Sequence, residues 1–417
     1  MHATTAAPVA APIQSGMLSR VVSEVLSRPL AYLSIPAGAS FVGLTTNWAG
    51  VKMLFYPIEY MGTDWFRETN SPYGLFGWQG VVPARTERMA SRLTTVVTAK
   101  LLSLREAFSR LEPEKFAALL SPTVQESIRR DAPNGAWWAW VLGPLLPWAL
   151  ARVVRELQSN VDEVLDLREV VLSAFMRDKL VLVELFQKVG KVELDFLVVS
   201  GAYFGALLGM AQMALWIAVP RGWTLPIAGA LVGYATNWIA IKLLFEPADP
   251  TPCGPFVLQG LFEARQPEVS SEFSTFLSER VLTSPRLIDE LANGKLKTRF
   301  EQLVRSAVPF VVPDAVVAAA ANGLRDLALE SKTHPAHIYV EERLAIEETL
   351  CYRLQRLSPM EFEDLLHPVF QEDEIILIIV GGILGAVAGV AQARFGLGGP
   401  STAGKLIRQS KPMYLRT

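Results

Sequence analysis

The 417-residue chain contains little cysteine and few charged residues, and each shortage excludes a class of protein. Two cysteines, Cys253 and Cys351, are too few for a disulfide scaffold or a thiolate cage around a metal ion. Charged residues make up 19% of the chain and the formal net charge is -2, so the chain as a whole lacks the basic surface that binds nucleic acid. Residues 1–15 lack the positive segment of a signal peptide, and residues 1–28 are expected to form a disordered, cationic tail.

Catalytic motifs are also missing. The chain has no G-x-S-x-G, no P-loop and no dinucleotide-binding fingerprint at a strand-to-helix turn. His334 and His337 have a spacing found in metal sites, but Pro335 lies between them and no carboxylate completes a ligand set. We therefore expect no enzyme activity, no cofactor and no metal ion.

Apolar residues, in contrast, are abundant. They make up 51% of the chain and give a mean hydropathy of +0.28, values that favour a membrane protein. Four charge-free runs of about twenty residues are each long enough to cross a bilayer as a helix. These runs predict a first transmembrane helix at 29–57, a transmembrane hairpin at 194–246 and a fourth transmembrane helix at 375–393.

The long segments between these runs have helical spacing. In residues 86–111, for example, the apolar side chains fall on one face of a helix. Ser121-Pro122 and Ser358-Pro359 predict helix N-termini, the second with Glu361 as the far half of a capping box. The fold class is therefore an all-α membrane protein. Its other parts are predicted to be a first helical soluble domain at 58–193, a second at 247–374 and a basic tail at 394–417.

A fifth apolar segment, residues 135–151, is shorter and is interrupted by Pro144 and Pro147. Its four tryptophans are typical of a segment at a membrane interface. We expect it to lie on the bilayer surface or to pack within the soluble domain, rather than to cross the membrane.

One motif occurs twice, as TNWAGVKMLFYP at 46–57 and TNWIAIKLLFEP at 236–247. FGWQGVVPAR is matched by FVLQGLFEAR, and GALLGMAQ by GAVAGVAQ, each 180 residues further along. These matches predict a tandem duplication. Because each copy has the order span, soluble helical domain, span, the two repeats should be parallel.

The repeated residues are the candidate functional residues. Asparagine in an apolar helix needs a hydrogen-bond partner, while tryptophan and lysine suit the headgroup region. The motif therefore has two interpretations. Either it holds helices together and anchors them at the interface, or it binds an anionic headgroup or lines a polar path. The candidate polar or lipid-headgroup site consists of Asn47, Trp48, Lys52, Asn237, Trp238 and Lys242. Helix packing is predicted for Gly205, Gly209, Gly385 and Gly389, and the repeated loop motif comprises Gln79, Gly80, Arg85, Gln259, Gly260 and Arg265.

Positive residues predict the orientation. The C-terminal tail carries five basic residues and no acidic one, and Arg20, Arg28 and Arg221 belong to the same side. The positive-inside rule places this side in the cytoplasm. The termini would then be cytoplasmic and the large loops extracytoplasmic.

The segments GYATNWIAIKLLFEP, QGLFEAR and FQEDEIILIIVGGILGAVAGVAQ resemble the bacterial membrane proteins of domain-of-unknown-function family 445. The resemblance covers residues 30–394 and implies a multi-pass helical protein of the inner membrane with large soluble helical segments. The first motif copy departs from the pattern, with Ala49-Gly50-Val51 where the second has Ile239-Ala240-Ile241.

These features favour a non-enzymatic membrane-anchored scaffold, or an envelope protein that binds lipid or a protein partner. The alternative is a transporter or lipid-handling conduit with a polar site between the two repeats. Membrane lipids are the expected partners, and an envelope protein partner and homo-oligomerisation are left open.

Overall fold

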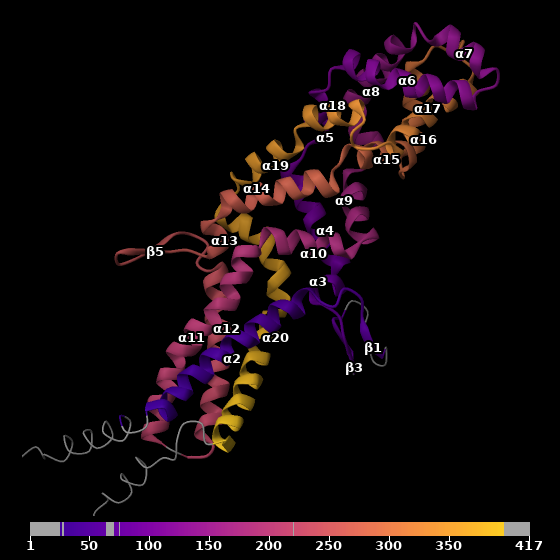
Figure 1. Ribbon diagram of the computed structural model, residues 1–417. Coiled ribbons are helices and arrows are strands. Elements are labelled where there is room, and N and C mark those ends of the chain that lie inside the picture. Colours follow the sequence, from indigo (N-terminus) through magenta and orange to yellow (C-terminus); the bar gives the residue numbers. More distant parts are fainter. Residues whose placement is uncertain (1–25, 27–28, 64–70, 75, 220, 396–417) are drawn as a thin grey trace, which may run out of the picture. The chain divides into compact units, whose positions relative to one another are not determined.

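The computed structural model describes residues 26, 29–63, 71–74, 76–219 and 221–395, and the chain divides into two compact units (Figure 1). Unit 1 comprises Met1–Leu54, Val192–Leu261 and Phe370–Thr417, and unit 2 comprises Phe55–Lys191 and Phe262–Val369. The tails predicted at 1–28 and 394–417 lie almost entirely outside the described residues. The described residues are mainly helical, which confirms the all-α fold class.

Unit 1 is built from long apolar helices. They are α2 (Pro29–Phe55), α11 (Lys191–Ala218), α12 (Thr224–Phe245) and the last part of α20 (Pro359–Phe395). Among the described residues, three helical segments are long and apolar enough to cross a membrane: Lys191–Ala218, Thr224–Phe245 and Leu377–Arg394. They match the predicted hairpin and the predicted fourth span, so the chain has the helices of a membrane protein.

The predicted first span is not among the three helices that are apolar enough to cross a membrane. Residues 29–57 were expected to cross the bilayer, and they form the 27-residue helix α2, but its composition is less apolar than that of the other three. Ser34, Thr45, Thr46 and Asn47 introduce polar groups into it. The described residues therefore contain three helices, rather than four, that are long and apolar enough to span a membrane.

Two small antiparallel sheets interrupt the helices. The first has β1 (Met61–Thr63), β2 (Tyr73–Gly74) and β3 (Phe76–Trp78) in the order β1-β3-β2, and the second pairs β4 (Thr251–Cys253) with β5 (Phe256–Leu258). Each sheet follows one copy of the TNW motif. Strands of two or three residues leave too little alternation to be found in a sequence.

Unit 2 is a single helical body that contains both predicted soluble domains, 58–193 and 247–374, apart from their ends. Its core helix α6 (Pro113–Asp131) packs against α8 (Leu146–Val164) and against α17 (Asp314–Leu329) from the second half of the chain. Ser127 donates to Asp326 at 2.5 Å and Arg110 donates to the carbonyl of Leu344 at 3.0 Å. The two long loops therefore fold together instead of separately.

The elements after the two motif copies come in the same order. In the first half they are α3 (Val81–Ala84), α4 (Thr86–Val96), the π-helix η1 (Val97–Leu101) and α5 (Leu104–Ser109). In the second half they are α13 (Leu261–Ala264), α14 (Gln266–Phe276), the π-helix η2 (Leu277–Val281) and α15 (Ser284–Asn293). Equivalent positions in the two halves thus have the same local structure.

The remaining helices complete unit 2 and connect these elements. In the first half they are α7 (Gly135–Leu142), α9 (Leu167–Arg177) and α10 (Lys179–Val189). In the second half they are α16 (Lys297–Ala307), α18 (Pro335–Leu344) and α19 (Ile346–Leu354).

Candidate functional site

The two asparagines of the repeated motif are buried in unit 1, and each donates a hydrogen bond to another helix. Asn47 Nδ2 in α2 lies 2.6 Å from the carbonyl oxygen of Leu197 in α11. Asn237 Nδ2 in α12 lies 2.8 Å from the carbonyl oxygen of Leu377 in α20. The expected partners within the bundle therefore exist, and they are backbone carbonyls of α11 and α20 rather than the other asparagine.

Glycines allow these helix pairs to approach closely. A Cβ added at Gly43 would lie 2.1 Å from the oxygen of Gly201, and one added at Gly233 would lie 2.2 Å from the oxygen of Gly381. Both distances are too short for any side chain. The four glycines predicted to pack helices lie in the same two interfaces, with added Cβ atoms 2.2–2.7 Å from backbone atoms of the facing helix: Gly205, Gly209, Gly385 and Gly389.

The tryptophans and lysines of the motif are separated from its asparagines. Trp48 and Trp238 are 56% and 46% exposed, whereas Asn47 and Asn237 are buried. Lys52 is exposed, and the partly buried Lys242 forms an ion pair with Glu246 one turn further along. The two amides therefore face neighbouring helices, whereas the two tryptophan rings and Lys52 are exposed.

The repeated loop motif closes the turn after each of the helices α2 and α12. Gln79 Nε2 donates to the carbonyl oxygen of Ile58 at 2.7 Å, and the backbone N–H of Gly80 donates to the carbonyl oxygen of Pro57 at 2.8 Å. In the second copy Gln259 Nε2 donates to Ala248 at 3.1 Å and Gly260 donates to Pro247 at 2.9 Å. Arg85 and Arg265 occupy the N-cap positions of α4 and α14. The motif therefore shapes the loop, a role that accounts for its glutamine and glycine.

A small cavity of about 20 Å³ lies among the four helices of unit 1. Its lining includes Gln212 from α11 and Gln392 from α20, which stand at equivalent places in GALLGMAQ and GAVAGVAQ. Gln212 Nε2 donates to the carbonyl of Leu225 at 3.4 Å. This volume is enough for about one water molecule. The sequence interpretation noted the glycines of these segments and missed the glutamines, although two buried amides at matching positions were a usable signal.

The histidines that were considered as metal ligands have structural surroundings. The fully buried His337 ring contacts Ser284 Oγ through Nδ1 and the carbonyl oxygen of Leu327 through Nε2, both at 2.8 Å. Burial lowers the pKa of His337, so the neutral ring is favoured. Among the described residues, no group of three His, Cys, Asp or Glu side chains is placed to hold a metal ion.

One buried carboxylate in unit 2, unlike the His337 ring, has no hydrogen-bond partner among the described residues. Glu263 in α13 is 4% exposed, and neither of its side-chain oxygens has a hydrogen-bond partner among the described residues. Burial, with a smaller contribution from the nearby charge of Glu363, raises the pKa of Glu263 to about 7. The first half of the chain has Pro83 at the equivalent position. The carboxylate is therefore specific to the second half.

An apolar pocket of about 360 Å³ lies at one end of unit 2, the end where Figure 1 shows α7. We call it the α7 pocket. Its wall combines α7 and the start of α8 with the end of α16, the 308–313 loop and the start of α17. Every residue that lines it is apolar, and Trp138, Leu145, Trp148 and Val311 are among them. Its volume lies within the range of small-molecule sites.

Specific backbone features position α7 at this pocket. Asn134 adopts a left-handed conformation with φ of 53°, which asparagine tolerates well, and so turns the chain between α6 and α7. A Cβ at Gly135 would lie 2.4 Å from the carbonyl oxygens of Ile128 and Arg129, so only glycine permits this approach. Gln125 Nε2 then joins α6 to α7 by donating to the carbonyl of Ala139 at 3.0 Å.

Arg305 positions the other wall of the pocket. Its guanidinium donates to the carbonyls of Val312 at 2.9 Å and Phe310 at 3.3 Å and forms an ion pair with Asp314 at 2.9 Å. These bonds fix the 308–313 loop while the side chain of Phe310 remains 93% exposed. The loop therefore holds an aromatic ring in contact with solvent.

The mouth of the pocket is surrounded by exposed apolar side chains. Residues 132–151 and 306–313 contain no charged residue. Trp140 is 77% exposed, and the pocket-lining Leu145, Trp148 and Val311 are each more than half exposed. We define the α7 surface as Trp137, Trp140, Leu145, Trp148, Phe310 and Val311. Exposed apolar groups gathered in this way mark interaction sites.

The structure also decides how residues 135–151 are folded. They form α7 and the beginning of α8, and Ala139 and Leu146 are buried in unit 2. Eight residues of α7 extend about 12 Å, too little to cross a bilayer. The 308–313 loop was not recognised in the sequence, although a charge-free run with a phenylalanine between two prolines was a signal for it.

Comparisons of the chain with family models, curated proteins and solved structures found no match. The resemblance of the TNW segments to domain-of-unknown-function family 445 therefore stays a prediction.

Proposed function

We propose that this protein is a non-enzymatic, membrane-anchored protein whose unit 2 docks onto a lipid bilayer through the α7 surface. The observation that carries the proposal is the convergence of two charge-free segments, 132–151 and 306–313, on one exposed surface with three tryptophans. Tryptophan favours the interface between water and lipid, because its ring is apolar and its N–H group is polar. A lipid bilayer offers both an apolar interior and a polar surface, so it is the partner that this surface fits.

The energetics suit a reversible contact. Removing an apolar side chain such as Phe310 or Trp140 from water stabilises the docked state by about 1.5–3 kcal/mol. Several such residues together can offset the translational and rotational freedom that is lost on docking. In a protein that stays in water, their exposure would bring no stabilisation. Folding alone gives no reason to place them there.

We also propose that α2 crosses the bilayer with the three more apolar helices, as part of two parallel repeats. Support comes from the contacts within unit 1. The α2–α11 pair has the hydrogen bond from Asn47 and the glycine contacts, and the α12–α20 pair has the same features around Asn237. Such contacts between small and polar residues hold helices together in lipid.

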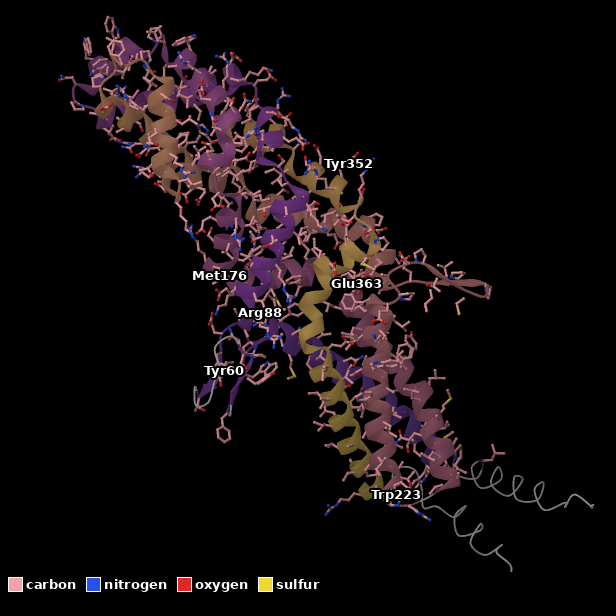
Figure 2. All side chains as sticks on the ribbon, turned by 180° about the vertical axis from the view of Figure 1, so that it is seen from behind. Tyr60, Arg88, Met176, Trp223, Tyr352 and Glu363 are labelled. Carbon is pink, nitrogen blue, oxygen red and sulfur yellow. The ribbon has the colours of Figure 1, made fainter. Side chains whose placement is uncertain are left out.

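A tryptophan at the start of α12 agrees with a spanning position. Figure 2 shows Trp223 at one end of unit 1, at the turn between α11 and α12, where it is 52% exposed. Trp238 lies fifteen residues further along, about 22 Å away, and is also exposed. This spacing is shorter than a hydrocarbon core of about 30 Å, so Trp223 alone lies where an aromatic belt at the end of the span is expected.

The proposed location is a bacterial inner membrane, with the termini in the cytoplasm and unit 2 outside. The basic residues of the C-terminal tail and Arg221 support this orientation. The resemblance to domain-of-unknown-function family 445 supports the location. Membrane lipids are the proposed partners.

A transporter or conduit between the repeats has weaker support. The cavity among the helices of unit 1 has a volume of about 20 Å³. Both asparagine amides are occupied by backbone carbonyls, at 2.6 and 2.8 Å. A polar substrate would have to displace these bonds.

Vesicle flotation tests the docking proposal. The full chain is kept in solution by an amphipathic polymer around its spanning helices and is mixed with phospholipid vesicles. We expect it to float with the vesicles, and the double variant Trp140→Ser, Phe310→Ser to remain at the bottom of the gradient. The matched control is Leu329→Ser, which removes an apolar side chain that is 86% exposed at the far end of α17. Equal flotation of all three proteins would exclude the α7 surface as the docking surface.

A further inference from the structure

We infer that the α7 pocket binds one acyl chain of a lipid or fatty acid. The inference deepens the proposed function and rests on it in one respect, because the α7 surface that would meet the bilayer surrounds the mouth of this pocket. It adds a binding site and a ligand class to what docking alone requires. Three properties of the pocket lead to it.

The first property is the chemistry of the wall. The wall exposes no polar atom to the pocket, so a polar group placed inside would find no partner to replace its hydration. Sites for functionalised small molecules contain at least a few placed polar groups. Water gains no hydrogen bond from this wall either. A hydrocarbon chain needs none of these partners.

The second property is the shape of the apolar space. A second apolar cavity, of about 60 Å³, lies deeper among α6, α8, α15 and α17. The two share four wall residues: Leu150, Val153, Val304 and Ala320. The α7 pocket and this deeper cavity are therefore adjacent, and the side chains of these four residues separate them. A flexible, unbranched chain fits such a space better than a compact ring system.

The third property is the mouth. Leu145, Trp148 and Val311 line the pocket and are each 57–61% exposed, so apolar side chains continue from the outer surface to the interior. An acyl chain could pass from a bilayer into the pocket without leaving an apolar environment. Its polar headgroup would remain outside, in the region where the tryptophan rings lie.

Photo-crosslinking tests the assignment on the full chain in an amphipathic polymer. The probe is palmitate with a diazirine near the end of its chain, and the adducts are located by peptide mass spectrometry. We expect adducts in residues 138–153 and 304–320. Ala320→Phe and Ala149→Phe fill the pocket from two different helices and should each reduce these adducts at least about tenfold, equivalent to 1.4 kcal/mol of binding.

Ala318→Phe is the matched control, because it places the same ring on the exposed side of α17. It should leave the adducts unchanged. Adducts confined to the helices of unit 1, or adducts that persist in both pocket-filling variants, would overturn the inference. Using two filling variants guards against one that fails to fold.

The outcome separates the two proposals. If the pocket variants lose the adducts but still float with vesicles, both proposals hold. If the wild-type chain forms the adducts but never floats, the docking function is wrong and the acyl-chain site stands. If it floats through the α7 surface but forms no adducts in the pocket, the acyl-chain site is wrong.

Discussion

Asn237 donates from its side-chain amide to the carbonyl oxygen of Leu377, across 2.8 Å between α12 and α20. Asn47 makes the same bond to Leu197 between α2 and α11, at 2.6 Å. Each amide thus joins two helices at the point where glycines let the backbones approach. We therefore expect the asparagine of the repeated Thr-Asn-Trp motif to have an architectural role in both places.

Replacement of these asparagines should weaken the helix pairs. We expect Asn47→Leu to lower the free energy of unfolding by about 1 kcal/mol, the usual size of an interhelical hydrogen bond in a membrane protein. Asn237→Leu should cost less, because Asn237 Oδ1 is buried without a partner among the described residues and its removal offsets part of the loss. Unfolding in mixed micelles measures both. Thr45→Val is the control, since the Thr45 hydroxyl donates to carbonyls of its own helix. A loss in the control as large as in the asparagine variants would contradict this role.

The glycines of α20 should differ sharply in their tolerance of alanine. A Cβ at Gly385 would lie 2.2 Å from the oxygen of Gly229, whereas one at Gly382 would have its nearest contact, the oxygen of Ala230, at 3.5 Å. Gly385→Ala should therefore destabilise unit 1 by about 1–3 kcal/mol. Gly382→Ala should be neutral or slightly stabilising, because alanine favours the helix. Thermal unfolding of the two single variants decides the matter, and similar midpoints would show that α12 and α20 do not pack this closely.

Glu263 should make unit 2 less stable as the pH rises. Its pKa is about 7 in the folded chain and near 4.5 when unfolded, so between these values the folded chain binds more protons. The contribution is complete below pH 4.5 and is lost as the pH rises through 7. A tenfold difference in proton affinity between the folded and unfolded chains corresponds to about 1.4 kcal/mol, so Glu263→Gln should be more stable than the parent at pH 8 by about 1–3 kcal/mol.

The exposed Glu268 supplies the control for this prediction, because Glu268→Gln makes the same change one helix further along. Unfolding is measured for both variants and the parent across this pH range. A stability gain that is the same at pH 5 and pH 8 would argue against titration of Glu263.

The orientation of the chain can be tested with its own thiols. Cys253 is exposed in β4, and Cys351→Ser removes the second thiol, whose pKa is raised by burial and by Glu347. We expect an impermeant maleimide to label Cys253 in intact cells whose outer layers are permeable to it. Labelling that requires lysis would place this loop in the cytoplasm and reverse the proposed orientation.

Much of the helical architecture could be predicted from sequence because it depends on local signals. The capping box at Ser358 is present as expected, with Ser358 N donating to Glu361 Oε2 at 3.1 Å and Glu361 N donating to Ser358 Oγ at 3.3 Å. In residues 86–111, in contrast, the apolar side chains were expected to share one helical face. The chain instead becomes extended at Leu102, and Ser103 caps the separate helix α5.

The same local pattern failed at Ser121-Pro122. These residues lie inside α6, where Ser121 Oγ donates to the carbonyl of Ala117 at 2.7 Å. The helix continues through the proline because its faces pack against α8 and α17, which a local pattern cannot reveal.

The candidate site could be predicted only in part. Four tryptophans in a segment that two prolines interrupt indicated that residues 135–151 lie on the bilayer surface or pack within the soluble domain. The α7 pocket, however, also needs Val304 and the 308–313 loop, more than 150 residues further along. A single sequence contains no signal for such a contact, so the pocket becomes visible only when the two loops fold together.

The most direct measurement is lipid contact at the α7 surface. Cys253→Ser and Cys351→Ser leave a chain without thiols, and Val311→Cys then carries a bimane label beside Phe310. A second chain carries the label through Leu329→Cys, at the other end of α17 and about 24 Å away along its axis. Both are reconstituted in vesicles that contain a nitroxide-labelled lipid. The proposed docking predicts strong quenching at position 311 and little at position 329; equally weak quenching at both would contradict it.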